Sequence, residues 1–481
     1  MIAKGEVFKM EAKQGVVCKW LLVPFSILTV TGAAASLSLW EDWDAVFEKQ
    51  GYNKSTKDWL LFVVLFGYLG SNPGLVTHFL GHIGAYVLAI ILTLVSYIGL
   101  GICATFKHGS GWHLFSTLLF LYLASFASSI AIVATISETL HNFSKRAGKF
   151  YIVLMMVYTL LAYSFEESLR KGMLRGISTR LYYPILGIFV AIVYSISCFI
   201  SKIVVIEDFY SRITVSQDVI GMLFLLLLAG LMIMVNYLCF LVNFQYTIYF
   251  IIFVIVLAIN FMAAYAIIQV SHKKIDSPKP YEEYLEDEED PEGTPLGEAI
   301  KDYKLYGVLI SSFIIIGTSS TFLKNIKVIK IANYAMAPES TYSSLFLLCQ
   351  SLGALVCGLL GLYANQFLFG TIGAIMAIIG YFCVIFLSWF YLETVLIAFS
   401  NGIWWVLAPL IVYRFFGAKP FAGVWGTILT INFWGMFLLG FVFTLFWENH
   451  PDPLPWSLGI YSGACLVAII VLALILNKNS N

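Results

Sequence analysis

The chain has 481 residues, of which 60% are hydrophobic and 12% are charged, and its formal net charge at pH 7 is zero. Soluble domains carry about 25% charged residues, so this composition excludes an ordinary globular protein and predicts an integral membrane protein that crosses the bilayer many times. The balanced charge gives no reason to expect a nucleic-acid partner. The lipid bilayer is therefore the first partner that the composition predicts.

The apolar runs that are long enough to span about 30 Å of hydrocarbon define the predicted elements. Eight lie in the first part of the chain, at 16–40, 58–80, 84–106, 112–138, 148–166, 180–206, 216–242 and 245–270. Six follow, at 304–323, 341–364, 366–388, 391–413, 421–447 and 455–476. Lys and Arg residues fall outside these runs or at their ends, so we expect none deep in a span. Their distribution favours both termini on the cytoplasmic side or its equivalent.

An acidic stretch separates the two groups of runs. Residues 272–304 hold 11 of the 28 acidic residues of the chain, together with several prolines. Such a segment cannot enter a bilayer and buries little apolar surface, so we expect it to lie in water. It is either a solvated linker without a site of its own or a docking segment through which the chain joins a larger membrane complex.

An internal repeat relates the two groups. The fourth and twelfth runs carry large apolar residues at the same spacing, and each run leads into a short basic turn. The matched pairs are Phe126 with Phe399, Ile130 with Ile403, Val133 with Val406 and Phe143 with Phe416, which aligns Ser128 with Asn401. The repeat predicts an N-terminal six-helix bundle (1–215), an inserted and peripheral helix pair (216–270), an acidic linker (271–303) and a C-terminal six-helix bundle (304–481).

Several short motifs, taken in order, resemble the major facilitator superfamily and within it the nodulin-like branch. They are Lys19-Trp20, T-G-A-A-A-S at 31–36, G-S-N-P-G-L-V-T-H-F-L-G at 70–81, N-F-S-K-R-A-G at 142–148, T-S-S-T-F-L-K-N at 318–325 and F-G-A-K-P-F-A-G at 416–423. The resemblance implies an all-α integral membrane fold of two six-helix bundles around a central cavity, with the inserted pair giving about 14 transmembrane helices. It also implies movement of one small solute by alternating access.

The gating motif of that family is altered in this chain. Its loop between the second and third helices usually carries an acidic and two basic residues, which form part of an ionic latch between the bundles. Here Gly74 and Gly81 match its glycines, but His78 stands at the acidic position, while Phe79 and His82 stand at the two basic positions. The charged latch is therefore lost, and we expect protonation of His78 near pH 6 to alter gating. The expected gating residues are Gly74, His78, Gly81, Arg146 and Lys419.

Polar side chains inside the apolar runs are the candidates for solute contact. They are Ser128, Ser129, Ser312, Gln350, Asn401 and Asn432, with Trp404 as an aromatic wall beside Asn401. The alternative is that these groups bond neighbouring helices, because an amide in hydrocarbon needs a partner whatever the function. Glu138 and Glu393 are the candidates for proton coupling, although each lies near a predicted helix end, where we expect interfacial exposure.

Motifs of enzymes are absent from the sequence. It contains no phosphate-binding loop, no G-x-S-x-G turn and no H-E-x-x-H pair, and its eight cysteines are scattered singly. We therefore expect neither catalysis nor a metal or other cofactor. The leading hypothesis is transport of a small neutral or weakly polar solute in the plasma membrane or an organellar membrane, including the mitochondrial inner membrane. The alternative is a transport-inactive, transporter-derived structural subunit of a larger membrane assembly.

Overall fold

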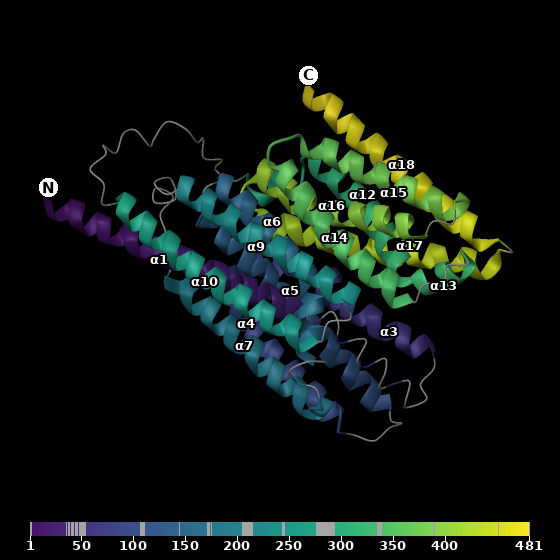
Figure 1. The fold of residues 1–481 in the computed structure, drawn as a ribbon, viewed down its shortest axis with the longest axis horizontal. Coiled ribbons are helices and arrows are strands. Elements are labelled where there is room, and N and C mark those ends of the chain that lie inside the picture. Colours follow the sequence, from purple (N-terminus) through teal and green to yellow (C-terminus); the bar gives the residue numbers. More distant parts are fainter. Residues whose placement is uncertain are drawn as a thin grey trace. The chain divides into compact units, whose positions relative to one another are not determined.

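The computed structural model describes most of the chain. The described residues are 2–34, 36, 39, 43, 47, 54–105, 111–143, 145–170, 174, 176–203, 215–242, 246–275, 294–333, 339–387, 390–450 and 452–480. The regular elements in these ranges are helices (Figure 1). The interior of the predicted acidic linker, residues 276–293, lies outside the described part.

The chain divides into two compact units. Unit 1 comprises Met1–Gly293 and Gly417–Gly426, and unit 2 comprises Thr294–Phe416 and Thr427–Asn481. The helices of unit 1 are α1 (Ile2–Ala34), α3 (Lys54–Leu65) with the π-helical turn η2 (Phe66–Gly70), α4 (Pro73–Cys103), α5 (Gly111–His141), α6 (Lys145–Ser168), α7 (Thr179–Ile203), α9 (Val215–Val242) and α10 (Tyr246–Ile275). The helices that follow are α11 (Leu296–Ala299), α12 (Tyr303–Lys324), α13 (Ile326–Ala332), α14 (Glu339–Gly361), α15 (Gln366–Phe386), α16 (Phe390–Phe416), α17 (Phe421–Asn449) and α18 (Pro453–Ser480).

Twelve helices in the described residues are long and apolar enough to cross a membrane. The predicted all-helical membrane fold is confirmed, but the expected count of about 14 is not. The run predicted at 58–80 is not one helix, because Asn72 adopts the left-handed region at φ 47° and its side chain caps a new helix that begins at Pro73. The first part of that run is the short helix α3 and the turn η2, with an apolar stretch of only Trp59–Gly70.

Within unit 1, α1 packs against α5, α6, α7 and α10, so it lies at the centre of the unit. Helix α4 packs against both α5 and α7. Helices α9 and α10, the predicted inserted pair, pack on each other and on α1 and α6. Their remaining faces expose large apolar side chains such as Leu227 and Met262. Such faces suit contact with lipid tails.

Within unit 2, α16 is the central helix and contacts α12, α14 and α15. The contact with α14 is close because both helices carry glycine there. A Cβ atom at Gly402 would lie 1.9 Å from the Gln350 carbonyl oxygen, and one at Gly353 would lie 2.5 Å from the Phe399 carbonyl oxygen. Small residues that let backbones approach are the usual basis of helix association in membranes.

We predict that Gly402→Ala destabilises unit 2 by about 1–3 kcal/mol, because the added methyl group forces α14 and α16 apart. The matched control is Gly459→Ala in α18, where a Cβ meets nothing within 4 Å. Thermal unfolding of the two variants in detergent micelles checks this expectation. Equal melting temperatures would contradict the close contact.

Candidate functional site

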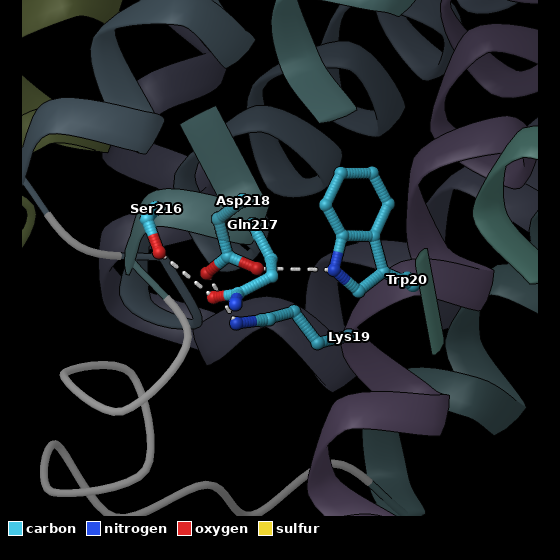
Figure 2. Close-up of polar contacts among 5 residues, drawn as sticks. All are labelled: Lys19, Trp20, Ser216, Gln217 and Asp218. Carbon is cyan, nitrogen blue, oxygen red and sulfur yellow. Dashed lines mark hydrogen bonds and ion pairs between the residues drawn. The ribbon is translucent and has the colours of Figure 1, made fainter. Parts of the chain in front are cut away.

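A buried ion pair joins α1 to α9 (Figure 2). The Lys19 ammonium lies 2.5 Å from one carboxylate oxygen of Asp218, and the Trp20 indole N–H donates to the other at 3.1 Å. Lys19 is 1% exposed and Asp218 is fully buried. The Lys19 ammonium also lies 5.0 Å from the centre of the ring of Phe143, two residues after the end of α5. The charge therefore has a carboxylate and an aromatic face as neighbours in place of water.

Lys19 lies near the start of the apolar stretch Lys13–Ala34, and the start of α9 covers it. The expectation that no Lys or Arg lies deep in a span stays a prediction. In the sequence, Lys19 and Asp218 each stand at the edge of a predicted run, which is the usual place of an exposed charge. The signal that could have found the pair is the apolar sequence around Lys19-Trp20 together with an acid in the first turn of the inserted pair.

Hydroxyl groups connect the helices of unit 1 near the centre of the bundle. Thr29 of α1 pairs with Ser197 of α7 at 3.0 Å, and Tyr86 of α4 donates to Thr135 of α5 at 2.9 Å. One turn earlier in α1, Ser26 pairs with Thr139 of α5, the two oxygens lying 3.4 Å apart. These neutral contacts hold four helices of the unit together without a charge.

Glu138 lies at the edge of this network and is buried. The Ser201 hydroxyl donates to its Oε1 atom, while its Oε2 atom has no hydrogen-bond partner among the described residues. Glu138 is 8% exposed and Glu393 is fully buried, so the expected interfacial exposure of both is wrong. The reason is tertiary, because α7 covers Glu138, and Asn333 at the end of α13 donates to Glu393 at 3.3 Å. Their roles in coupling stay predictions.

In unit 2 the polar candidates gather around α12. The Ser312 hydroxyl donates to the side-chain oxygen of Asn432 on α17 at 2.6 Å. The Asn401 amide nitrogen donates to Ser320 at 3.5 Å, and Asn401 Oδ1 has no partner among the described residues. The structure thus brings Ser312 and Asn432 together and pairs Asn401 with Ser320, which is not among the predicted solute-contact residues. All three predicted residues are buried, whereas Ser320 is half-buried.

Other predicted contact residues do not join this group. The Trp404 indole donates to the Gly370 carbonyl of α15 at 3.2 Å, so its ring packs against α15 and forms no wall beside Asn401. Gln350 is buried and its backbone meets α16 at Gly402. In unit 1, the Ser128 hydroxyl donates to the Ala124 carbonyl of its own helix, and Ser129 is buried on the same helix.

The predicted gating residues are spread over unit 1. Gly74 packs tightly, because a Cβ there would lie 1.9 Å from the Ala422 carbonyl oxygen. Gly81 has non-helical backbone angles inside α4, with φ 69° and ψ 172°. His78, Arg146 and Lys419 are exposed, and the His78 ring lies against Phe79. Each glycine therefore has a structural reason, close packing at Gly74 and a non-helical backbone at Gly81. The other three predicted gating residues are at the surface.

Two solved structures share this fold along nearly the whole chain. One is FucP, a major facilitator superfamily transporter in the outward conformation, with a TM-score of 0.54 and 13% identity, covering 95% of this chain and 99% of its own. The other is the proton:xylose symporter XylE bound to 6-bromo-6-deoxy-D-glucose, with a TM-score of 0.53 and 11% identity, covering 97% of this chain and 95% of its own. No family model and no curated protein sequence matches the chain. The predicted major-facilitator-type fold is therefore confirmed.

We predict that Lys19→Met lowers the free energy of unfolding by about 3–5 kcal/mol, because it leaves the Asp218 carboxylate buried without its cation. The double variant Lys19→Met with Asp218→Leu should recover most of that loss, since it removes both charges. Lys202→Met, at an exposed lysine of α7, is the control and should change little. Denaturant unfolding in micelles, followed by circular dichroism, measures all three. A double variant no more stable than Lys19→Met would contradict the pairing.

Proposed function

We propose that this chain, which has the fold of the major facilitator superfamily transporters, moves a small neutral or weakly polar solute across a membrane by alternating access. The observation that carries the proposal is Asn401. Its side chain is buried in unit 2, yet one of its two polar atoms has no partner among the described residues. An amide in that position costs free energy unless something completes its hydrogen bonds, and a solute with a hydroxyl or N–H group would do so.

The surroundings of Asn401 favour a solute without net charge. The buried polar side chains of α12, α16 and α17 include Ser312, Asn401 and Asn432, which are hydroxyls and amides. Among the described residues of unit 2, none of the buried side chains is Lys or Arg. A carboxylate or phosphate held in this unit would lack the buried cation that usually binds such groups. Neutral donors and acceptors suit hydroxyl- or amide-bearing molecules.

The structural neighbours support the same class of function. Both are transporters, and one is a symporter of protons and xylose, a neutral molecule rich in hydroxyl groups. At 11% and 13% identity they establish the fold, and the function is inferred from this chain's own residues. The alternative, an inactive structural subunit, has no comparable support in the contacts of unit 2.

We propose in addition that Glu138 couples transport to protons. Its carboxylate is buried in a predicted span. One carboxylate oxygen accepts a hydrogen bond from Ser201, and the other has no partner among the described residues. An ionisable group in such a place is a functional candidate, because keeping it there is costly. Glu393 is the corresponding candidate of unit 2, where Asn333 holds one of its oxygens.

For Asn401 we predict that alanine lowers solute uptake into proteoliposomes about tenfold, because one hydrogen bond to a buried group contributes on the order of 1 kcal/mol or more. The matched control is Asn260→Ala in α10 of unit 1, a buried asparagine whose Oδ1 atom likewise has no partner among the described residues. It separates the proposed solute contact in unit 2 from the mere loss of a buried amide. A panel of sugars, polyols and amides serves as substrate. Absence of uptake of every compound by the wild type would overturn the proposal in favour of a structural subunit.

For Glu138 we predict that glutamine abolishes the acceleration of uptake by an inward proton gradient but preserves solute exchange at equal pH. Glutamine keeps the shape and the hydrogen bond from Ser201 but cannot carry a proton. Glu448→Gln, at an exposed position near the end of α17, is the control and should retain the acceleration. Unchanged acceleration in Glu138→Gln would exclude this residue from coupling.

A further inference from the structure

Helix α4 is broken near its start. Gly81 has φ 69° and ψ 172°, so Pro73–Leu80 forms a short helical segment that meets the longer part of α4 at an angle. A positive φ of this kind is readily adopted only by glycine, and here a Cβ would meet no atom within 4 Å. Packing space therefore does not impose the glycine; the backbone angle does. The break is a built-in joint in the helix.

The residue directly after the joint ties α4 to α5. The His82 ring lies 5.8 Å from the His141 ring, centre to centre, in an edge-on arrangement. The His82 Nδ1 atom also lies 3.3 Å from the Ser137 hydroxyl, one turn before His141 on α5. His82 is half-buried and His141 is exposed at the end of α5, so solvent protons reach the pair.

The short segment has a second anchor at its other end. Gly74 packs so closely on α17 that a Cβ atom there would lie 1.9 Å from the Ala422 carbonyl oxygen and 2.6 Å from the Gly426 Cα atom. The Asn72 side chain caps the segment by accepting from the Leu75 N–H. Ala422 and Gly426 are in the first turns of α17 and belong to unit 1. A change of angle at Gly81 therefore displaces a segment that bears directly on the start of α17.

Other ionisable groups near this end of α4 are placed differently. On α4 itself, His78 is exposed against Phe79. On α5, the Glu138 carboxylate is directed to Ser201 of α7, and Lys202 of α7 is exposed. Cys198 of α7 is half-buried, and Lys419, just before α17, is exposed. Among the described residues, His141 is the titratable group whose ring contacts His82.

We infer that His82 and His141 form a pH-sensitive switch that sets the angle of α4 at Gly81. With both rings neutral, the edge-on contact between His82 and His141 and the hydrogen bond between His82 and Ser137 hold the first turn after Gly81 against the end of α5. When both rings are protonated, the two imidazolium ions repel each other. The contact is present above the pKa of the pair and lost as the pH falls through it.

We place the pH response at His82, whereas the sequence alone places it at His78, and the switch does not depend on the proposed transport activity. The family motif favours His78 because this residue stands at the acidic position. The structure leaves that side chain at the surface and gives His82 the contacts that a switch requires. The switch acts on the angle of a helix, so it is measurable in a protein that transports nothing.

The test measures the angle directly in the full-length protein in lipid nanodiscs. Spin labels attached through a ketone-bearing amino acid at the exposed positions Phe79 and Ile98 report the distance across the joint, and the native cysteines stay in place. Double electron-electron resonance spectra are recorded between pH 8 and pH 3.5. We expect the wild-type distance to shift by several ångströms toward the acidic end of this range, where both imidazoles become protonated.

Three variants decide the outcome. His82→Gln and His141→Gln should each abolish the shift, because a single imidazolium has no partner to repel. His78→Gln should retain it with an unchanged midpoint. Since His141 is exposed, its replacement leaves no buried gap, and it keeps the test valid if His82→Gln fails to fold. A wild-type distance that does not change with pH, or a shift that persists in His141→Gln, would overturn the switch.

Discussion

A polar group inside a membrane protein must find its partner within the protein, because the hydrocarbon offers none. The constraint is most severe for a charge, and the buried side chains of Lys19 and Asp218 meet it by pairing with each other. The two residues lie 199 positions apart in the sequence, yet the Lys19 ammonium lies 2.5 Å from one carboxylate oxygen of Asp218. The Trp20 indole donates to the other oxygen. Since Asp218 is in the first turn of α9, the pair joins the start of this helix to α1. The packing of α9 on α6, and of α10 on α1 and α6, adds to this link.

Elsewhere the same constraint is met without charge. In unit 1, hydroxyl pairs such as Thr29 with Ser197 connect helices, and in unit 2 Ser312 donates to Asn432. Asn401 and Glu138 differ from them because each retains an oxygen without a partner among the described residues. Groups of this kind are costly to keep in a stable fold, which is the physical argument for assigning them to solute and proton binding.

The short helical segment Pro73–Leu80 has a tightly packed glycine near its start and a break in the helix directly after its end. At one end Gly74 allows the backbone of α4 to touch α17, and at the other Gly81 breaks the helix. Glycine serves close approach in the first case and a positive φ in the second, two separate uses of the missing side chain. The two glycines therefore give the ends of this segment different properties, a close packing contact at Gly74 and a break of the helix at Gly81.

The sequence by itself determined that the chain is a membrane protein, where its helices approximately lie and that it resembles the facilitator fold. Long apolar runs, and the charged and turn-forming residues between them, are local properties of the chain. It also selected several polar residues that the structure brings together, such as Ser312 and Asn432. It could not determine their partners, since Ser320 contacts Asn401 across 81 positions. Nor could it show that Lys19, Glu138 and Glu393 are buried, because burial of a residue at the edge of a run depends on which other helix covers it. That is decided only when the helices pack, and the break at Gly81 and the meeting of His82 with His141 belong to the same level of structure.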